Sequence, residues 1–385
     1  MSQPDTLNLF VFIDAFGWEI CKRNSFLEEV LPHRQPLATL LGYSSTCDPT
    51  IITGCLPRDH GHFSFFFYNH GESPFGWCRY LEGLPRFITR RGRVRHWLSR
   101  LIQRAHGYTG YFQIYNVPFR LLPYFDYSEK RDIYQEGGIN NGNPTIFTFL
   151  RDQKIPFYLS DWRRPEEHNL SALEQDILRG EIRFAYLYLA AMDAILHQWG
   201  TRDARVREKI EGYDRSLRRI LDLARRQYAH VNLTVFSDHG MTDIREQCDL
   251  IPRIESTNLR FGTDYVAMYD STMARFWFLK PEARPPIEAV LRSETQGRIL
   301  TEDELAEFGC DFPGHGYGDL IFLLNPGVLL CPSFMGETPL RGMHGYDPRD
   351  TDSIALFATN MNGFEYPKRL DDLYRIMRQS IQAEP

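Results

Sequence analysis

The chain has 385 residues, of which 43% are hydrophobic and 24% are charged, and its formal net charge is −6. These values are ordinary for a globular protein, and the length is sufficient for two or three domains or for one large α/β domain with insertions. The negative net charge argues against binding to a nucleic-acid polymer, which needs a strongly basic surface.

The cysteines and the N-terminal residues indicate the compartment. Seven cysteines occur without any C-x-x-C pair, so neither a disulfide framework nor a zinc–thiolate site is indicated. The N-terminal sequence MSQPDTLNLFVFIDAFGW lacks the basic region and the cleavage site of a signal peptide. Because no stretch reaches 18 apolar residues, we expect a cytoplasmic protein without a transmembrane segment.

Five short apolar runs predict buried parallel strands, because they lack the alternation of a half-exposed strand. In chain order they are residues 9–14, 184–193, 231–240, 319–324 and 354–358. Residues 205–228 form an amphipathic helix pattern, with an apolar stripe of Val206, Ile210, Tyr213, Leu217, Ile220 and Leu221. This alternation predicts an α/β fold, a doubly wound, mostly parallel sheet sandwiched by helices, in a single domain over residues 1–385.

Two segments interrupt this rhythm, and we expect both to be insertions. Residues 63–150 are rich in Phe, Tyr, Arg and Gly and would form a cap, and residues 250–340 would form a second small subdomain. Within the first, RVRHWLSRLIQRAH carries an apolar stripe flanked by arginines: Val94, Trp97, Leu98, Leu101 and Ile102. The stripe suits either a cap that grips an anionic or lipid-like substrate or a helix with a solvated basic face.

Three of the predicted strands end in an aspartate: Asp14, Asp193 and Asp238. In an open α/β sheet the ligand site lies beyond the carboxyl ends of the strands, so these side chains are expected at one site. An aspartate at the end of an apolar strand is costly unless a positive charge meets it. The pattern therefore favours a cation site.

Three histidines complete this candidate site. His197 lies four residues after Asp193, His239 follows Asp238 directly, and His344 lies in RGMHGYDP. Three Asp and three His form a mixed oxygen and nitrogen ligand set that suits Zn²⁺ and, less tightly, Mn²⁺ or Fe²⁺. Six ligands exceed one tetrahedral site but are enough for two. Paired metal ions about 4 Å apart are typical of phosphoryl transfer.

The stretch GYSSTCDPTIITG offers candidate nucleophiles in Ser44, Ser45, Thr46 and Cys47. A hydroxyl bound to a metal ion has a lowered pKa and attacks without a separate base. The stretch is also a plausible helix start. The dipole and the free N–H groups of such a helix stabilise a hydroxylate and favour a bound phosphate.

Together these motifs resemble the alkaline phosphatase superfamily, and within it the nucleotide pyrophosphatase/phosphodiesterase (type I phosphodiesterase) branch. Members have a strand ending in Asp, a nucleophile before T-G-x-x-P-x-x-H-G, and then D-x-x-x-H, S-D-H-G and H-G-Y-D. The corresponding segments are Asp14, TGCLPRDHG (53–61), DAILH (193–197), SDHG (237–240) and HGYDP (344–348). The order agrees over nearly the whole chain, which implies an alkaline phosphatase-like catalytic domain.

The resemblance implies a role for each residue and two divalent metal ions, most simply Zn²⁺. One metal site would comprise Asp193, His197 and His344. The other would comprise Asp14, Asp238, His239 and the nucleophile. The resemblance further implies double displacement through a phospho-enzyme that water then hydrolyses.

The position of the nucleophile follows from the family spacing. In these phosphodiesterases and in the related sulfatases, the nucleophile lies nine residues before the Thr of T-G, which is Thr53 here. This spacing points to Ser44, with Ser45 second and Thr46 third. Cys47 lies too close to Thr53, and the arginine of the sulfatase motif is missing, so we interpret Cys47 as a buried apolar thiol.

One departure concerns the group that holds a phosphoryl oxygen. The family usually has an Asn shortly after H-G, but Phe65 occupies that place in HGHFSF. The candidate substitutes for substrate binding are Asn69, His62 and Tyr68. No arginine flanks Ser44, whereas monoesterases of the superfamily bring one against the extra phosphate charge, so the sequence favours a diester.

The sequence therefore predicts a two-metal phosphodiesterase or nucleotide pyrophosphatase that acts on a small-molecule phosphodiester or pyrophosphate. The aromatic segment 63–150 would recognise the leaving group. The alternatives on the same scaffold are a phosphomonoesterase, a phosphonate-ester hydrolase and a phosphotransferase. A metal-stabilised binding protein that has lost its chemistry is the alternative from another class.

Overall fold

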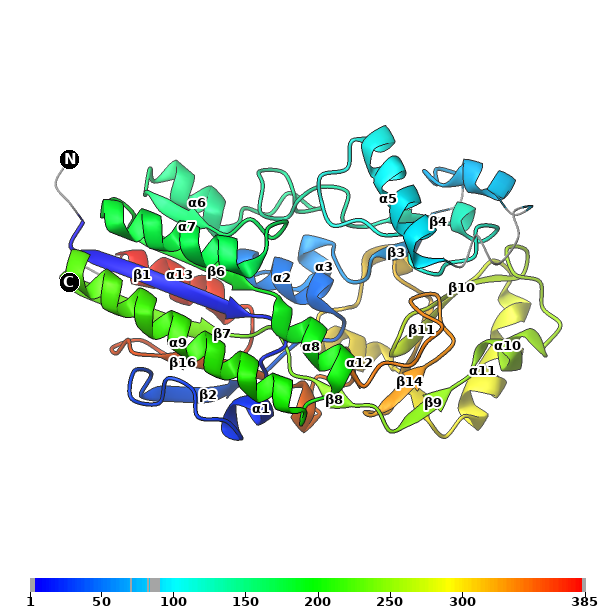
Figure 1. The fold of residues 1–385 in the computed structure, drawn as a ribbon. Helices are drawn as coiled ribbons and strands as arrows, with labels where there is room; N and C mark the ends of the chain where they lie inside the picture. The colour runs from blue at the N-terminus through cyan, green and yellow to red at the C-terminus, as the bar shows by residue number, and fades with distance from the viewer. Residues whose placement is uncertain (1–3, 70, 82, 84–90, 383–385) are drawn as a thin grey trace.

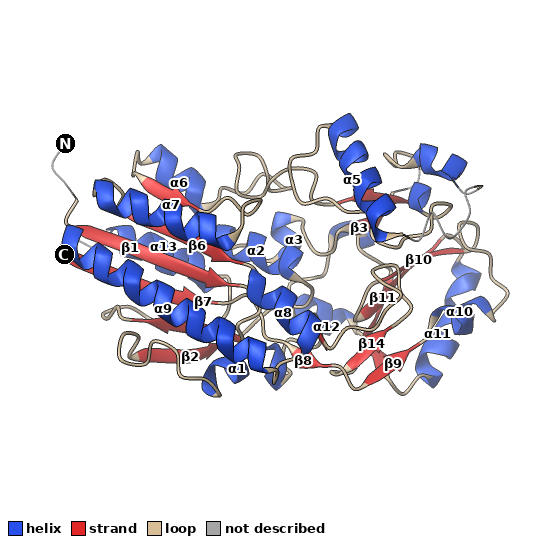
Figure 2. Ribbon diagram, viewed as in Figure 1, coloured by secondary structure: helices blue, strands red, loops and turns tan. Residues whose placement is uncertain are grey.

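A computed structural model describes residues 4–69, 71–81, 83 and 91–382 of the protein. Figure 1 shows two lobes side by side, with both ends of the chain at the far end of the larger lobe. Figure 2 shows that strands form the centre of the larger lobe and that helices cover it. Within the described residues, every helix is too short or too polar to cross a membrane.

The larger lobe is built on a six-stranded sheet. Its strands, in spatial order, are β2 (His33–Leu37), β16 (Ala355–Thr359), β7 (His230–Phe236), β1 (Thr6–Ile13), β6 (Phe184–Leu189) and β5 (Phe157–Leu159). Strands β7, β1, β6 and β5 run parallel, whereas β16 is antiparallel to both of its neighbours. The prediction of a doubly wound, mostly parallel sheet is therefore confirmed.

Helices cover both faces of this sheet, because side chains of the central strand alternate between two apolar cores. Leu9 and Val11 of β1 belong to one core, and Phe10 and Phe12 belong to the other. The first core is covered by α1 (Trp18–Lys22), α7 (Glu166–Arg179), α8 (Ala191–Trp199) and α9 (Ala204–Gln227). The second core is covered by α2 (Ser44–Thr53), α6 (Ile146–Asp152) and α13 (Asp372–Gln382).

The smaller lobe combines the two segments that interrupt the sequence pattern. Its four-stranded antiparallel sheet comprises β10 (Tyr265–Tyr269), β11 (Met273–Phe278), β13 (Leu320–Leu324) and β12 (Gly297–Ile299). Its helices are α10 (Ile251–Glu255), α11 (Arg284–Ser293) and α12 (Glu302–Glu307). The earlier segment adds α5 (Gly92–His106) and the hairpin of β3 (Phe66–Tyr68) with β4 (Phe125–Tyr127). Side chains from residues 66–127 and 248–346 share one apolar core, so these parts of the chain pack as one body, whereas Ile133, Ile139 and α6 belong to the second core of the larger lobe.

Short elements complete the described chain. They are α3 (Pro57–His60), β8 (Thr242–Asp243), β9 (Glu246–Cys248), β14 (Val328–Leu330) and β15 (Gly342–Met343). Strand β8 pairs with β15, and β9 pairs with β14. The 3₁₀ turns are η1 (Gly76–Leu81), η2 (Leu122–Tyr124), η3 (Pro281–Ala283), η4 (Pro313–His315) and η5 (Thr351–Ser353).

Four of the five strand predictions need correction. Residues 231–240 form a strand only as far as Phe236. Residues 184–193 form a strand only as far as Leu189, and Asp193 lies in the first turn of α8. The run 319–324 belongs to the antiparallel sheet of the smaller lobe, and 354–358 is antiparallel to β7. An apolar run indicates that a strand is buried on both faces. It does not indicate whether the neighbouring strand runs parallel or antiparallel to it.

The helix predictions were more accurate. Helix α9 buries all six residues of the predicted stripe. Helix α5 forms as predicted, but Trp97 and Leu101 are exposed, which the predicted stripe does not allow. Arg95 and Ser99 take the inward positions instead, and hydrogen bonds to backbone atoms satisfy both side chains.

Candidate active site

The predicted ligand residues meet at the carboxyl edge of the large sheet. Asp14 follows β1 directly, and Asp238 and His239 lie just beyond the end of β7, which is parallel to β1. Asp193 and His197 are one turn apart on α8, which begins just after the neighbouring strand β6. His344 arrives from a distant part of the chain, directly after β15.

These six residues form two adjoining clusters. In each, one ligand atom per residue lies within 4.8 Å of the others: Asp193, His197 and His344 in the first, and Asp14, Asp238 and His239 in the second. The rings of His239 and His344 stack with their centroids 3.7 Å apart, so the clusters share an edge.

The donor atoms are arranged as ligands of cations. Asp14 Oδ1, Asp193 Oδ1 and Asp238 Oδ2 are buried and accept no hydrogen bond within the described chain. His197 and His239 use Nδ1 to donate to the backbone oxygens of Gly342 and Gly240, at 2.8 and 2.9 Å. In its neutral form each imidazole then has a lone pair on Nε2, which lies 3.2 or 3.0 Å from a carboxylate oxygen. A cation between the two atoms, either a proton or a metal ion, would satisfy both, so the residues fit bound metal ions.

The electrostatics of the second cluster lead to the same conclusion. Burial raises the pKa of Asp14 well above its usual range, and the charges on Asp238 and Asp193 raise it further. Burial alone would lower the pKa of His239, but the same carboxylates, with Asp238 first, raise it to about 9. The charge of neighbouring carboxylates contributes to both shifts, after burial in the case of Asp14, and a bound cation would offset that charge.

Of the candidate nucleophiles, Ser44 is the one that contacts the clusters. It is the first residue of α2, and its Oγ lies 3.2 Å from Nε2 of His239. The hydroxyls of Ser45 and Thr46 instead donate to the backbone oxygen of Phe63. Cys47 is buried in the core beneath the helix, where burial raises the pKa of its thiol.

A cavity of about 530 Å³ opens onto both clusters and onto Ser44. One wall comes from the first inserted segment and the strand edge: Phe65, Tyr111, Tyr115, Glu129, Ile133, Tyr134, Trp162 and Tyr188. The opposite wall comes from the chain between β14 and His344 and includes Leu329, Met335, Leu340 and Met343. The described lining residues include no Lys or Arg. Burial raises the pKa of Glu129, which lies in the aromatic wall, to about 8.

The three residues predicted to bind substrate lie away from this cavity. His62 is buried and its Nε2 accepts from the N–H of Asn140, while Asn69 donates to Asp126. Tyr68 packs against the ring of Trp277. None of the three is among the described lining residues. The aromatic wall was predicted only as a composition bias, because no sequence signal shows which of many aromatic side chains face a cavity.

A buried hydroxyl bridge connects the start of α2 to the loop that carries His344. Tyr43, the N-cap of α2, lies with its Oη 2.9 Å from Oγ1 of Thr272, and Thr272 Oγ1 donates to the backbone oxygen of Gly345 at 2.8 Å. Gly345 has a φ of +87°, and a Cβ there would lie 2.7 Å from the Tyr43 ring. The bridge therefore fixes the spacing between Ser44 and His344.

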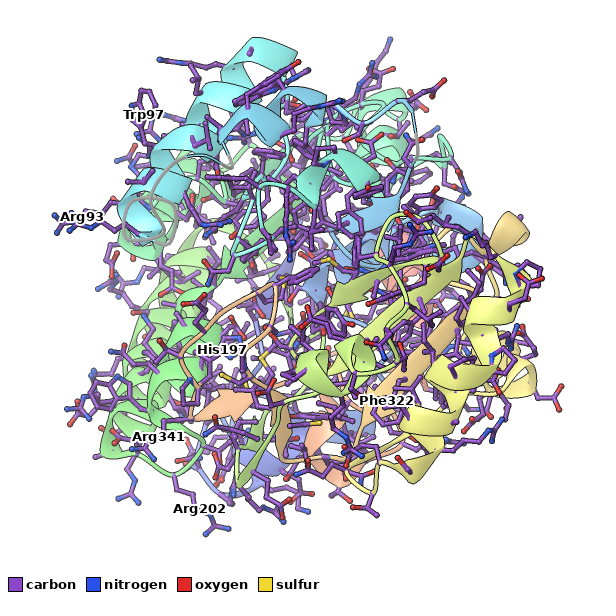
Figure 3. The ribbon with its side chains drawn as sticks, turned by 90° about the vertical axis from the view of Figure 1, so that its right-hand side faces the viewer. Arg93, Trp97, His197, Arg202, Phe322 and Arg341 are labelled. Carbon is purple, nitrogen blue, oxygen red and sulfur yellow. The ribbon has the colours of Figure 1, made fainter. Side chains whose placement is uncertain are left out.

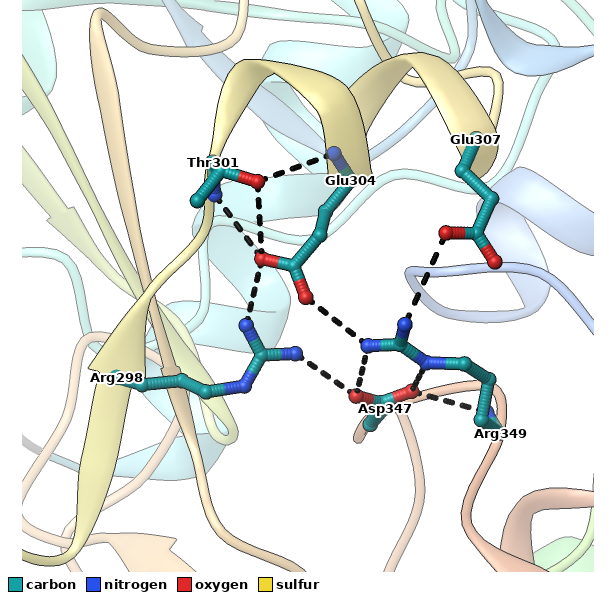
Figure 4. Close-up of polar contacts among 6 residues, drawn as sticks. All are labelled: Arg298, Thr301, Glu304, Glu307, Asp347 and Arg349. Carbon is teal, nitrogen blue, oxygen red and sulfur yellow. Dashed lines mark hydrogen bonds and ion pairs between the residues drawn. The ribbon is translucent and has the colours of Figure 1, made fainter.

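An ion-pair network holds the other end of this loop against the smaller lobe (Figure 4). Asp347 Oδ2 lies 2.8 Å from Nη2 of both Arg298 and Arg349. Glu304 pairs with the same two arginines, at 2.7 and 3.0 Å. Partial burial opposes the ionisation of Asp347, but hydrogen bonds from Arg349 and Arg298 lower its pKa to about 2. The loop is thus held at Gly345, next to His344, and again at Asp347.

The substitution Thr272→Val tests the bridge, because valine keeps the shape of threonine and removes its hydroxyl. Two buried groups, Tyr43 Oη and Gly345 O, would lose a partner, so we expect the free energy of unfolding to fall by about 1–3 kcal/mol. Denaturant titration followed by circular dichroism measures the change. Thr272→Ser keeps the hydroxyl and should retain most of the stability, and an equal loss in both variants would contradict the assignment.

Comparison with known proteins agrees with this site. A family model described as type I phosphodiesterase / nucleotide pyrophosphatase matches residues 13–347. Ectonucleotide pyrophosphatase/phosphodiesterase family member 7 of Mus musculus is 20% identical over 370 residues, which are 91% of this chain and 76% of the relative. The protein of the same name from Rattus norvegicus is 21% identical over 264 residues, covering 66% of this chain and 54% of the relative.

Solved structures share the fold. Human ectonucleotide pyrophosphatase/phosphodiesterase 5 superposes with a TM-score of 0.70 at 14% identity, over 98% of this chain and 96% of that chain. The murine protein superposes with a TM-score of 0.69 at 15% identity, over 98% and 95% of the two chains. Because the family model covers most of the chain, from the end of β1 to the loop after His344, the protein belongs to the type I phosphodiesterase/nucleotide pyrophosphatase family of phosphoric ester hydrolases, in the alkaline phosphatase superfamily.

Proposed function

We propose that the protein is a two-metal phosphodiesterase that uses Ser44 as its nucleophile. The observation that carries this proposal is the position of Ser44 Oγ, 3.2 Å from His239 Nε2 at the edge of two clusters of ligand atoms. The hydroxyl lies at the N-terminus of a ten-residue helix and lines the cavity. The arrangement combines a nucleophile, a cation site and space for an ester group.

Two divalent ions would be held by the clusters. Asp193, His197 and His344 would hold one ion. Asp14, Asp238, His239 and Ser44 would hold the other. Imidazole nitrogens mixed with carboxylate oxygens suit Zn²⁺ best, and Mn²⁺ or Fe²⁺ less tightly. When bound, such ions supply positive charge for the entering and leaving oxygens and favour ionisation of a hydroxyl ligand.

The reaction then runs in two displacements on Ser44. In the first, Ser44 Oγ forms a bond to phosphorus, its proton passes to solvent, and the bond between phosphorus and the leaving oxygen breaks. In the second, water forms a bond to phosphorus and the serine–phosphorus bond breaks, which restores the hydroxyl and releases a phosphomonoester. The N–H groups of Ser44 and Ser45 precede the first hydrogen bond of α2, from Thr46 N to Tyr43 O, so they are available to a phosphoryl oxygen.

The charge of the cavity favours a diester over a monoester. The described lining residues include the acidic side chains of Asp48, Glu129 and Asp270 and no Lys or Arg. Arg275 approaches from behind the wall, but it is fully buried and its Nε lies 2.8 Å from Asp270 Oδ2, so its charge is already matched. The second negative charge of a monoester would find no basic side chain there.

The walls of the cavity suit a carbon-rich leaving group. The lining includes the aromatic residues Phe65, Tyr111 and Trp162 and the aliphatic residues Leu340 and Met343. Apolar walls with a few polar groups at one end are typical of small-molecule sites, in which the polar end fixes orientation. We therefore propose an organic phosphodiester as the substrate.

We also propose that the protein is cytoplasmic. All seven cysteines are free, and six of them are buried. Reduced thiols are the rule in the cytosol, whereas secreted proteins commonly form disulfides. Fractionation of cells that produce the protein, with antibody detection, tests this location.

The substitution Ser44→Ala removes the proposed nucleophile. We expect turnover of bis-p-nitrophenyl phosphate to fall by at least about a thousandfold, because no other hydroxyl of α2 contacts the clusters. The metal content, measured by elemental analysis of the same preparation, should stay near that of the unchanged protein. Ser45→Ala is the matched control and should keep most of the activity. Full activity in Ser44→Ala together with loss in Ser45→Ala would overturn the assignment.

Removal of the metal ions should abolish activity and release about two equivalents of metal per chain. Dialysis against a chelator, with elemental analysis of the protein and the dialysate, measures both quantities. Substitution of His344 by Ala should weaken one site and leave the other, because His344 belongs to the first cluster only. Undiminished activity after exhaustive chelation would contradict the metal mechanism.

A paired substrate assay tests the ester class. We expect kcat/KM to be higher for bis-p-nitrophenyl phosphate than for p-nitrophenyl phosphate by about tenfold or more, because the described lining residues include no Lys or Arg to meet the second charge of the monoester. A wide preference for the monoester would instead favour a phosphomonoesterase. Phosphorylated acceptor alcohol in place of free product would indicate a phosphotransferase, and hydrolysis of phosphonate esters alone would indicate a phosphonate-ester hydrolase.

A further inference from the structure

Helix α5 presents a basic and aromatic outer surface that the active site does not use. Its sequence, GRVRHWLSRLIQRAH, contains four arginines and no acidic residue. Trp97 is 66% exposed and Leu101 is 47% exposed. Figure 3 shows Arg93 and Trp97 projecting from the same helix, away from the rest of the lobe. Arg100 and Arg104 are also exposed.

The inner side of the same helix is firmly packed. Leu98 and Ile102 belong to the core of the smaller lobe. Arg95 is buried and donates to the backbone oxygen of Val117 at 2.9 Å, and its guanidinium lies 4.8 Å from the centre of the Phe119 ring. Ser99 accepts from the N–H of Ile114. Because these contacts fix the orientation of the helix, Trp97 and Leu101 point outward as part of a rigid face.

The composition of this face selects one kind of partner. A tryptophan and a leucine surrounded by arginines are typical of helices that lie in a membrane interface, where the ring and the aliphatic chain enter the acyl boundary and the cations meet anionic headgroups. A nucleic acid would match the arginines but would leave Leu101 without an apolar partner.

We propose that α5 docks the protein on an anionic lipid surface through a face formed by Arg93, Trp97, Arg100, Leu101 and Arg104. The helix also contacts the cavity wall from behind, since Arg95 donates to the backbone oxygen of Tyr115, which lines the cavity. A docked bilayer would therefore lie about one helix diameter, roughly 10 Å, from that wall. Docking would bring the cavity wall at Tyr115 to the side of the protein that faces the headgroup layer.

Sedimentation with lipid vesicles tests this proposal on the full chain. Vesicles of phosphatidylcholine with phosphatidylserine should bind the protein, and vesicles of phosphatidylcholine alone should bind it about tenfold less, because the arginines need anionic headgroups. The double substitution Trp97→Ala with Leu101→Ala should reduce binding to the anionic vesicles about tenfold or more. Leu178→Ala is the matched control, because Leu178 is 56% exposed on α7, and it should bind as the unchanged protein does.

Two further measurements keep the outcome independent of catalysis. Far-ultraviolet circular dichroism should be the same for the double variant and the unchanged protein, since both residues are exposed. Hydrolysis of soluble bis-p-nitrophenyl phosphate should also be unchanged, so a failure of the proposed function leaves the vesicle result intact. Equal sedimentation of the double variant would overturn the proposal. So would failure of the unchanged protein to bind vesicles, including a case in which it binds single-stranded DNA instead.

Discussion

The structure depends on one electrostatic constraint, which is that three carboxylates, Asp14, Asp193 and Asp238, lie close together at the carboxyl edge of a parallel sheet. One oxygen of each accepts no hydrogen bond within the described chain: Asp14 Oδ1, Asp193 Oδ1 and Asp238 Oδ2. Such a group needs positive charge or a proton, because the desolvation of one buried carboxylate already costs several kcal/mol. His197 and His239, whose Nδ1 atoms donate to backbone oxygens, each place Nε2 beside one of these carboxylates. The proposed metal ions resolve this constraint.

The large sheet alone does not complete the arrangement. It positions Asp14 and Asp238 through adjacent parallel strands, and α8 adds Asp193 and His197 one turn apart. The sixth side chain, His344, lies on a loop that contacts the smaller lobe. Thr272, at the turn between β10 and β11, hydrogen-bonds to this loop and to the residue before Ser44. The smaller lobe therefore does two things: it walls the cavity and it sets the distance between the proposed nucleophile and one of the clusters.

The sequence predicted which six residues meet at the sheet edge better than it predicted the direction of two strands, for a physical reason. Asp14 and Asp238 follow the ends of strands, which a sequence pattern can show. Asp193 and His197 are four residues apart, a spacing that places both side chains on one face of a helix. The sequence pattern therefore identified this pair, although residues 190–193 are not a strand. The antiparallel direction of residues 319–324 and 354–358 was not predicted. Burial on both faces removes the alternation of apolar and polar residues from parallel and antiparallel strands alike. The bridge at Thr272 had no sequence signal, since one threonine hydroxyl gains meaning only from partners more than 70 residues away.

The exposure of Trp97 and Leu101 was also not predicted, because it too depends on partners that lie elsewhere in the chain. In the sequence, Trp97 and Leu101 continue the stripe of Leu98 and Ile102, because each lies on the neighbouring helical row. The structure replaces them on the inward side with Arg95 and Ser99, whose polar atoms meet backbone groups of residues 114–117. A stripe predicted from hydrophobicity alone assigns buried arginine to the surface. The backbone partners that make its burial tolerable are not visible in the sequence.

Phe65 stands where the resemblance expects an asparagine, so on the proposed mechanism the backbone would have to bind the phosphoryl oxygen. The described lining residues include neither Asn nor Gln, and the predicted substitutes lie elsewhere, with Asn69 occupied by Asp126. The hydroxyl of Ser45 is directed to Phe63, so it is not free to serve. The remaining hydrogen-bond donors beside Ser44 are the first backbone N–H groups of α2, which precede the hydrogen bonds within the helix. On the proposed mechanism, the helix that carries the nucleophile would then also hold the phosphoryl oxygen. Because Tyr43 caps that helix and contacts Thr272, the bridge to the smaller lobe would orient both groups at once.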